Sequence, residues 1–228
     1  MKSRLPFPIL YEDHDVVVID KPDGLLTTHT RAKESNTAEE WLNDYVRKGQ
    51  RKSCKHVWLV HRLDRETSGV MMFAKDEETA EWFRSQWNEV TEKTYLARVE
   101  GGLSSPSGVF ESWLLEDADG YKVRSVPPPL QPSKPPKPSK LSKPAKFART
   151  EWRKLSEKDG TTLVEVRLKS GRKNQIRVHF SEAGHPVVGD VKYGGQKASR
   201  LYLDACRLRF RHPRTGKWID VAHESPLL

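Results

Sequence analysis

The densest group of reactive side chains lies at residues 61–69, HRLDRETSG, between two short apolar runs. Loops held in place by rigid strands are where catalytic groups tend to lie. Asp64 has Arg62 and Arg65 close to it in sequence, and nearby cations favour the ionised form of a carboxylate. An ionised carboxylate can act as a nucleophile or as a base. The alternative is a polar turn whose charges are incidental.

A second group lies at residues 169–179, KSGRKNQIRVH, where four basic side chains and two amides surround the start of a predicted helix. Backbone N–H groups at a helix N-terminus bind phosphate, so this stretch suits a polyanion. The alternative is a basic helix start on a solvated face. His179 alone is weak evidence for catalysis, because a lone histidine is more often a core or surface residue.

A third segment, residues 127–146, is rich in proline and contains no acidic residue. Its lysines recur at every third position: Lys134, Lys137, Lys140, Lys143 and Lys146. Polyproline II has about 3 residues per turn, so this period places the ammonium groups on one face. The segment could be a cationic arm that follows an RNA backbone. The alternative is a solvated, flexible linker.

The elements that must position these groups follow from apolar periodicity and turn signals. Thr37 and Glu40 form a predicted capping box before a helix, and Asp76 caps a second helix. A third helix is expected at 174–183. Strands are expected at 16–19, 57–60, 70–74, 94–100, 109–115, 121–126, 162–168, 201–210 and 218–221. Many strands with few helices, not in strict alternation, predict an α+β fold with a mixed, mainly antiparallel sheet flanked by helices.

Composition narrows the classes of partner. The formal net charge is +9, which favours a polyanion such as nucleic acid. Cys54 and Cys206 form no Cys/His cluster, so we expect no metal site and no disulfide framework. There is no apolar run long enough for a membrane span and no signal peptide, so we expect a cytoplasmic protein with no membrane partner.

The motif HRLDRETSG resembles the signature of the RluA-type pseudouridine synthases. Further stretches resemble landmarks of that family in the right order: KPDG at 21–24, KTYLARVEG at 93–101, GRKNQIRVH at 171–179, and GHP with GD at 184–190. The resemblance covers residues 9–225. It implies the pseudouridine synthase fold, with residues 1–228 as one catalytic domain of two closely joined subdomains. We also expect that no S4 domain precedes Ile9.

The resemblance implies roles residue by residue. Asp64 would be the catalytic carboxylate, and Tyr95 would stack on the target uracil and is a candidate for handling the C5 proton. Arg177 would pair with Asp64, Ile176 would form an apolar wall beside the base, and Arg62 would fill the gap left by the flipped nucleotide. The other expected substrate-binding residues are His61, Leu63, Arg65, Thr67, Ser68, Gly69, Arg172, Asn174 and Gln175.

The implied reaction isomerises a uridine of structured rRNA or tRNA after base flipping. It is redox-neutral, so we expect no cofactor, and the family leads us to expect a monomer. Two departures from the pattern stand out. Asn174 occupies a position where the family commonly has His. The Pro/Lys-rich segment replaces a connection whose composition is usually less biased toward proline and lysine.

Two other functions compete with this prediction. A non-catalytic RNA-binding module on the same fold would keep the basic surface without using Asp64. A metal-dependent nuclease would need carboxylates and histidines spaced to hold divalent ions, and the sequence shows no such cluster.

Overall fold

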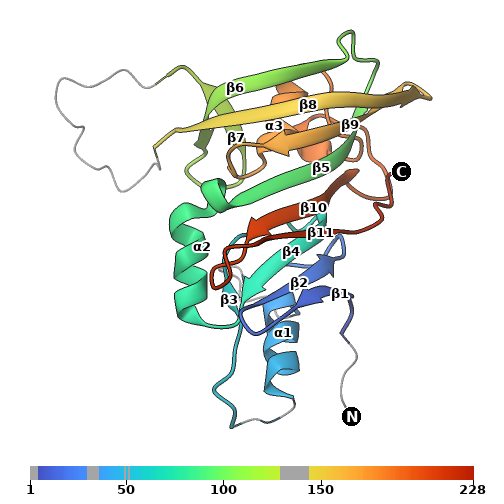
Figure 1. The fold of residues 1–228 in the computed structure, drawn as a ribbon. Coiled ribbons are helices and arrows are strands. Elements are labelled where there is room, and N and C mark those ends of the chain that lie inside the picture. Colours follow the sequence, from blue (N-terminus) through green and yellow to red (C-terminus); the bar gives the residue numbers. More distant parts are fainter. Residues whose placement is uncertain (1–4, 30–35, 49, 51, 129–143) are drawn as a thin grey trace, which may run out of the picture. The chain divides into compact units, whose positions relative to one another are not determined.

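The structure is a computed structural model that describes residues 5–29, 36–48, 50, 52–128 and 144–228 (Figure 1). Its helices are α1 (Ala38–Arg47), α2 (Glu77–Val90), α3 (Gln175–Glu182) and the 3-10 turn η1 (Val191–Tyr193). Its strands are β1 (Ile9–Glu12), β2 (Val16–Lys21), β3 (Trp58–Leu59), β4 (Ser68–Ala74), β5 (Thr91–Glu100), β6 (Ser107–Glu116), β7 (Val123–Val126), β8 (Lys146–Lys158), β9 (Thr161–Leu168), β10 (Leu203–Arg211) and β11 (Trp218–Ala222).

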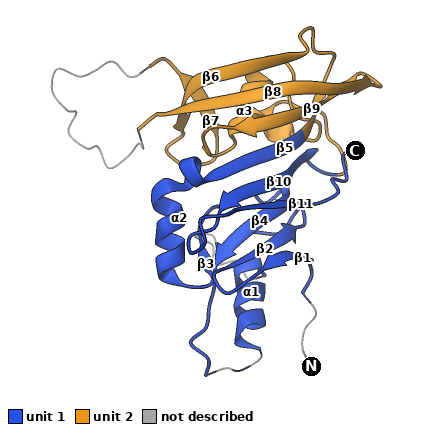
Figure 2. Ribbon diagram, in the orientation of Figure 1, with its two compact units in different colours: residues 1–96, 200–228 blue, residues 97–199 orange. Residues whose placement is uncertain are grey.

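The chain forms two compact units, in agreement with the two subdomains expected from the sequence (Figure 2). Unit 1 contains residues 1–96 and 200–228, and unit 2 contains residues 97–199. Strand β5 contributes residues to both units. The predicted α+β class is confirmed, because helices flank a mixed sheet.

In unit 1, the strand order begins β1-β2-β4-β10, with β3 also paired to β4 and β11 paired to β10. Strands β4 and β10 run parallel, whereas β1–β2 and β2–β4 are antiparallel. Successive side chains of β2 enter two different core clusters: Val16 and Val18 face one, and Val17 and Ile19 the other. A sheet buried on both faces requires continuous apolar strands, which is why β2 and β4 lack a polar alternation.

One helix covers each face of this sheet. Leu42 of α1 packs with Val17 and Ile19, and Phe83 of α2 packs in the opposite cluster. Both predicted helix starts are confirmed: Thr37 and Glu40 make the two bonds of a capping box, and the Asp76 carboxylate accepts from the backbone N–H of Thr79. The two faces of the sheet therefore have separate cores.

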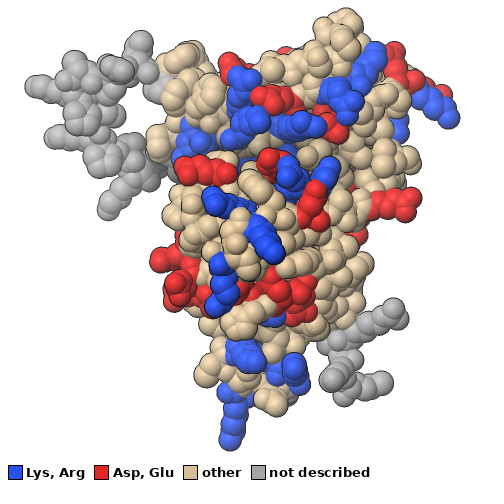
Figure 3. All heavy atoms as spheres, in the orientation of Figure 1, with Lys and Arg blue, Asp and Glu red and all other residues tan. Residues whose placement is uncertain are grey.

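Unit 2 is built on the antiparallel order β9-β8-β6-β7, with α3 on one face. Val178 of α3 packs with Leu114, Val123 and Ala148. Charged side chains of β6, β8 and β9 form cross-strand ion pairs, Arg149 with Glu111 and Arg153 with Glu165. Figure 3 shows acidic and basic side chains interspersed on the visible face. Many basic charges of these strands are therefore balanced within the protein.

Two strands were absent from the prediction, β1 and the longer β8. The inward-facing positions of β8 include Ala148, Thr150 and Trp152, so its apolar signal is weak. Lys146 is the exposed first residue of β8, paired with Leu114 of β6, so the predicted polyproline II geometry is wrong at this position. Lys134, Lys137, Lys140 and Lys143 lie outside the described residues. None of the helices in the described part of the chain is long and apolar enough to cross a membrane.

Candidate active site

The loop that carries Asp64 joins β3 to β4 in unit 1, as the sequence predicted. The backbone N–H of Thr67 donates to the Asp64 carbonyl over 3.1 Å, which closes a tight turn directly after the aspartate. The Thr67 side chain is buried, whereas Arg62 and Arg65 are exposed. The turn therefore presents Asp64 between two solvated cations.

A buried lysine, Lys21, anchors the backbone of this loop. The Lys21 ammonium donates to the carbonyls of Pro22 (2.8 Å), Leu25 (2.7 Å) and Arg65 (3.2 Å). Burial lowers the pKa of Lys21 to about 8; the charges of Asp23, Asp64 and Glu66 oppose that shift, and Arg200 adds to it. One cation thus ties the residue after Asp64 to the KPDG turn.

Two further bonds fix the front half of the loop. The buried Thr27 hydroxyl donates to the Leu63 carbonyl over 2.9 Å. The backbone N–H of Met72 donates to His61 Nε2 over 3.0 Å, and the His61 ring stacks on Trp87 with centroids 4.5 Å apart. Burial, and then the charge of Lys93, lowers the pKa of His61 to about 3, so the ring is neutral and accepts this bond.

The end of the loop enters β4 beside β10. Gly69 has φ +111°, and a Cβ there would lie 2.4 Å from the Ala205 carbonyl oxygen. Only glycine tolerates both this backbone conformation and this close approach. The parallel pairing of Gly69 with Ala205 therefore sets the direction in which the loop leaves the sheet.

A polar network surrounds Ser68 at the same point. Its hydroxyl donates to the fully buried Asp204 over 2.5 Å and accepts from Arg200 Nη2 over 2.6 Å. His223 bridges Asp204 and Asp20, at 2.9 Å and 3.2 Å. Hydrogen bonds to these two carboxylates raise the pKa of His223 to about 9. The network binds the loop that carries Asp64 to the C-terminal part of unit 1.

Tyr95 lies on β5 and packs against the core cluster on the α1 side of the unit 1 sheet, together with Leu63 and Ala205. Burial raises the pKa of the Tyr95 phenol well above its usual range, and the charge of Asp64 adds to the shift. The phenol is therefore neutral at physiological pH. This environment favours a role for Tyr95 as a stacking ring over a role as a proton donor.

The other predicted group lies in unit 2, around α3. Arg177 makes a bidentate ion pair with Asp190, through Nε–Oδ2 and Nη2–Oδ1 distances of 2.7 Å. Both side chains are buried, at 5% and 0% exposure. Charged pairs with this fork geometry are strong and directional, so Asp190 fixes the orientation of the guanidinium. The predicted pairing of Arg177 with Asp64 joins residues of different units and stays a prediction.

Comparisons with known proteins agree with this arrangement. A family model described as RNA pseudouridylate synthase matches residues 15–182. The dual-specificity RNA pseudouridine synthase RluA of Yersinia pestis is 33% identical over 214 residues, which cover 91% of this chain and 94% of that protein. The chain belongs to the RluA-type family of RNA pseudouridine synthases. Enzymes of this family are isomerases.

Two more relatives show the extent of the match. Ribosomal large subunit pseudouridine synthase C of Vibrio parahaemolyticus is 29% identical over 229 residues, covering 96% of this chain but 66% of that protein. The solved structure of human RNA Pseudouridylate Synthase Domain Containing 4 superposes with a TM-score of 0.74 at 25% identity, covering 96% of this chain and 88% of the other. The pseudouridine synthase fold thus extends over nearly the whole chain.

Within this family fold, internal contacts occupy three more of the expected substrate-binding side chains besides Ser68. His61 accepts from Met72 as described above, and the Leu63 side chain lies in the core cluster on the α1 side. The Gln175 amide is buried, accepts from Ser170 and the Arg172 backbone, and donates to Arg149 and Thr150. We therefore interpret these three residues as supports of the site.

The remaining residues near α3 have mixed environments. Asn174 is buried at the N-terminus of α3, with φ +52°, and its Oδ1 accepts from Lys192 (3.2 Å) and Tyr193 (3.1 Å). Ile176 is buried, and Arg172 donates from Nε to the Phe147 carbonyl. Asparagine tolerates the left-handed backbone region better than most residues, which explains how this chain accommodates Asn174.

Four site residues were not among the predicted ones: Lys21, Asp190, Arg200 and Asp204. The first two lie inside the KPDG and GD motifs, so the motifs marked them without giving them a role. Arg200 precedes β10 and Asp204 lies near its start, and β10 is remote in sequence from Ser68. Only the β4–β10 pairing brings them to the loop.

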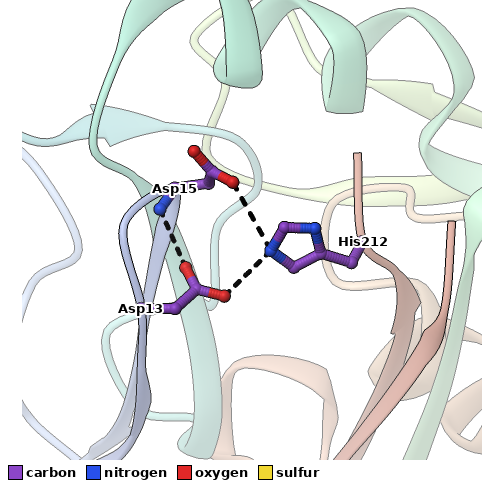
Figure 4. A group of neighbouring side chains, drawn as sticks. All are labelled: Asp13, Asp15 and His212. Carbon is purple, nitrogen blue, oxygen red and sulfur yellow. Dashed lines mark hydrogen bonds and ion pairs between the residues drawn. The ribbon is translucent and has the colours of Figure 1, made fainter. Parts of the chain in front are cut away.

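Asp13, Asp15 and His212 form a cluster whose ligand atoms lie within 4.8 Å of one another (Figure 4). Protein donors occupy its carboxylates. Asp13 accepts from Tyr11 and His212, and Asp15 accepts from Arg214 over 2.5 and 3.0 Å. The Arg214 guanidinium holds the pKa of the Asp15 carboxyl well below its usual range. We interpret the cluster as an ion-pair junction that ties the β1–β2 turn to the β10–β11 hairpin.

Proposed function

We propose that this chain isomerises a specific uridine of structured rRNA or tRNA to pseudouridine, with Asp64 as the catalytic carboxylate. The observation that carries the proposal is the anchored loop of unit 1. Hydrogen bonds of Lys21, Thr27 and His61 fix the backbone of this loop, and Asp64 begins its tight turn. Rigid support of this kind pre-organises a reacting group.

Pseudouridylation breaks the N1–C1′ bond, turns the uracil and joins C5 to C1′. The reaction is redox-neutral and needs no cofactor. Its target atoms are buried in stacked RNA, so the nucleotide is extruded before reaction. Three routes are open to an ionised Asp64: attack at C1′, attack on the base, or removal of the C2′ proton.

The neighbouring residues support this role in different ways. The neutral Tyr95 ring offers a stacking surface for the extruded uracil. Arg177, fixed by Asp190, supplies a rigid cation that we expect to pair with Asp64, and Ile176 supplies an apolar wall. Exposed Arg62, beside the loop turn, fills the gap left in the RNA. These roles rest on the family pattern together with the local contacts.

The names of the relatives indicate the class of RNA. One is named for the large ribosomal subunit, and another, tRNA pseudouridine synthase C of Haemophilus ducreyi, is named for tRNA. Both rRNA and tRNA are therefore proposed substrates. Single-stranded loops and bulges are the sites at which proteins read RNA most specifically. We expect the target uridine to lie in such a loop.

The decisive experiment is release of tritium from RNA labelled at uracil C5, using tRNA and rRNA from a strain that lacks this gene. Wild-type protein should release tritium from one fraction, whereas Asp64→Asn should release none and still bind the RNA. Loss of binding together with turnover would contradict the catalytic role of Asp64. No release from either fraction by folded, RNA-binding wild type would favour the non-catalytic RNA-binding module.

A further inference from the structure

Arg200 lies in the bend that precedes β10 and is partly buried. Its Nη2 donates to the Ser68 hydroxyl over 2.6 Å, and its Nε donates to the Leu201 carbonyl over 3.3 Å. A guanidinium has five N–H donors, so these two bonds leave further donors without an acceptor among the described residues. Arg200 is thus fixed against Ser68, which lies only four positions after Asp64 in the sequence.

No carboxylate of the described residues forms an ion pair with Arg200, in contrast to three arginines of the β10–β11 hairpin. Arg207 pairs with Asp220, Arg209 with Glu92, and Arg214 with Asp15. The nearest anionic group along the hydrogen-bond chain is Asp204, which Ser68 separates from the guanidinium and which also bonds His223.

A partly buried cation without a direct counter-ion is an expensive arrangement unless a ligand supplies the anion. Planar guanidinium groups match the geometry of phosphate oxygens and bind them through two parallel bonds. The bond to Ser68 places Arg200 at the point where the loop that carries Asp64 enters β4. An RNA strand whose uridine reaches Asp64 would therefore bring a backbone phosphate near Arg200.

We propose that Arg200 binds a phosphodiester of the substrate RNA next to the flipped uridine, and that Ser68 holds the guanidinium in position for it. This inference rests on the proposed function and adds a substrate-binding residue to it. Arg200 would position the strand and contribute affinity that depends on salt. Ser68 would act through Arg200, as a positioning residue.

The test is the salt dependence of RNA binding, measured in the Asp64→Asn background so that turnover plays no part. Binding is followed with the RNA fraction that releases tritium, or with total tRNA if neither fraction does. Loss of one phosphate contact should flatten the plot of log affinity against log salt by about 0.7–0.9. Arg200→Gln should show this change and bind roughly 10-fold more weakly or worse.

Matched variants separate a phosphate contact from a structural effect. Arg200→Lys keeps the charge and should keep the wild-type slope. Arg207→Gln removes one equally positive, already paired charge of β10 and should leave the slope near wild type. Ser68→Ala keeps the guanidinium but frees it, and should weaken binding without flattening the slope.

A slope for Arg200→Gln equal to that of Arg207→Gln would overturn the proposal and reduce Arg200 to a support of the loop. If Arg200→Gln does not fold, full affinity in Ser68→Ala would overturn it instead. The two proposals fail separately. Tritium release by wild type with an unchanged Arg200→Gln slope refutes only the phosphate site, whereas a changed slope without any tritium release refutes only the catalytic function.

Discussion

Tyr95 combines a partly buried ring with a phenol whose pKa is raised by burial and by Asp64. A phenol held neutral in this way contributes its ring to the site. Stacking of a base on an aromatic ring is worth about 1–3 kcal/mol. Tyr95→Phe should therefore keep most of the turnover, and Tyr95→Ala should lose roughly 10- to 100-fold in kcat/KM for tritium release.

The comparison of the two Tyr95 variants distinguishes ring from hydroxyl. Equal activity of Phe and Ala variants would remove the stacking role. A Phe variant as poor as the Ala variant would show that the hydroxyl takes part in the reaction, as expected if Tyr95 handles the C5 proton.

Arg177 and Asp190 form the buried ion pair of unit 2. Removing one partner of such a pair costs about 3–5 kcal/mol, because the other charge loses a hydrogen-bonded counter-ion. Asp190→Asn should lower the free energy of unfolding by about this amount, measured by urea denaturation. Asp220→Asn, which breaks the exposed pair with Arg207, is the control and should cost at most about 1 kcal/mol. Similar losses of unfolding free energy in both variants would contradict the stabilising role of Asp190.

At the scale of elements, the β4–β10 contact determines how the catalytic loop enters the sheet. A Cβ at Gly69 would collide with the Ala205 carbonyl, and φ is +111° there. Gly69→Ala should destabilise the protein by about 2–4 kcal/mol, because it combines a steric clash with backbone strain. Exposed Gly171 has open space around its Cβ position and no positive φ, so Gly171→Ala is the control. Equal urea midpoints for the two variants would refute the close-approach argument.

Most elements could be predicted because each leaves a local signal. The runs of β2 and β4, the Thr37 capping box and the Asp76 cap all follow from neighbouring residues. Strand β8 leaves almost none, since its buried positions include alanine and threonine and its outer face is charged. Its place between β6 and β9 depends on pairing with strands distant in sequence.

At the scale of the whole molecule, His223 links the C-terminal part of unit 1 to the catalytic loop through Asp204 and Ser68. Its pKa is raised to about 9, above the ordinary value of about 6.5. Its contribution to stability is therefore complete below about pH 6.5 and is lost as the pH rises through 9. The pKa of Lys21 is lowered, so its contribution to stability depends on pH in the opposite direction. The pH dependence of wild-type stability alone would therefore not isolate the contribution of His223.

The difference in unfolding free energy between wild type and His223→Gln isolates it. We expect the variant to be less stable by about 1–2 kcal/mol near pH 6, and the gap to narrow as the pH approaches 9.5. His56→Gln alters a partly exposed histidine outside this network and is the control. A gap that stays constant over this range would show that His223 acts by packing alone.

The sequence by itself determined the α+β class, the position of the loop that carries Asp64, the helix starts and the family, because these depend on residue types at short spacing. Tertiary structure alone decided which side chains support the site. Gln175 and His61 have the same sequence signals as substrate contacts, yet internal donors and acceptors occupy them. Asp190 becomes the partner of Arg177, and Arg200 and Asp204 reach Ser68, through contacts between segments far apart along the chain. Hydrogen-bond partners depend on distance in space, which local spacing does not encode.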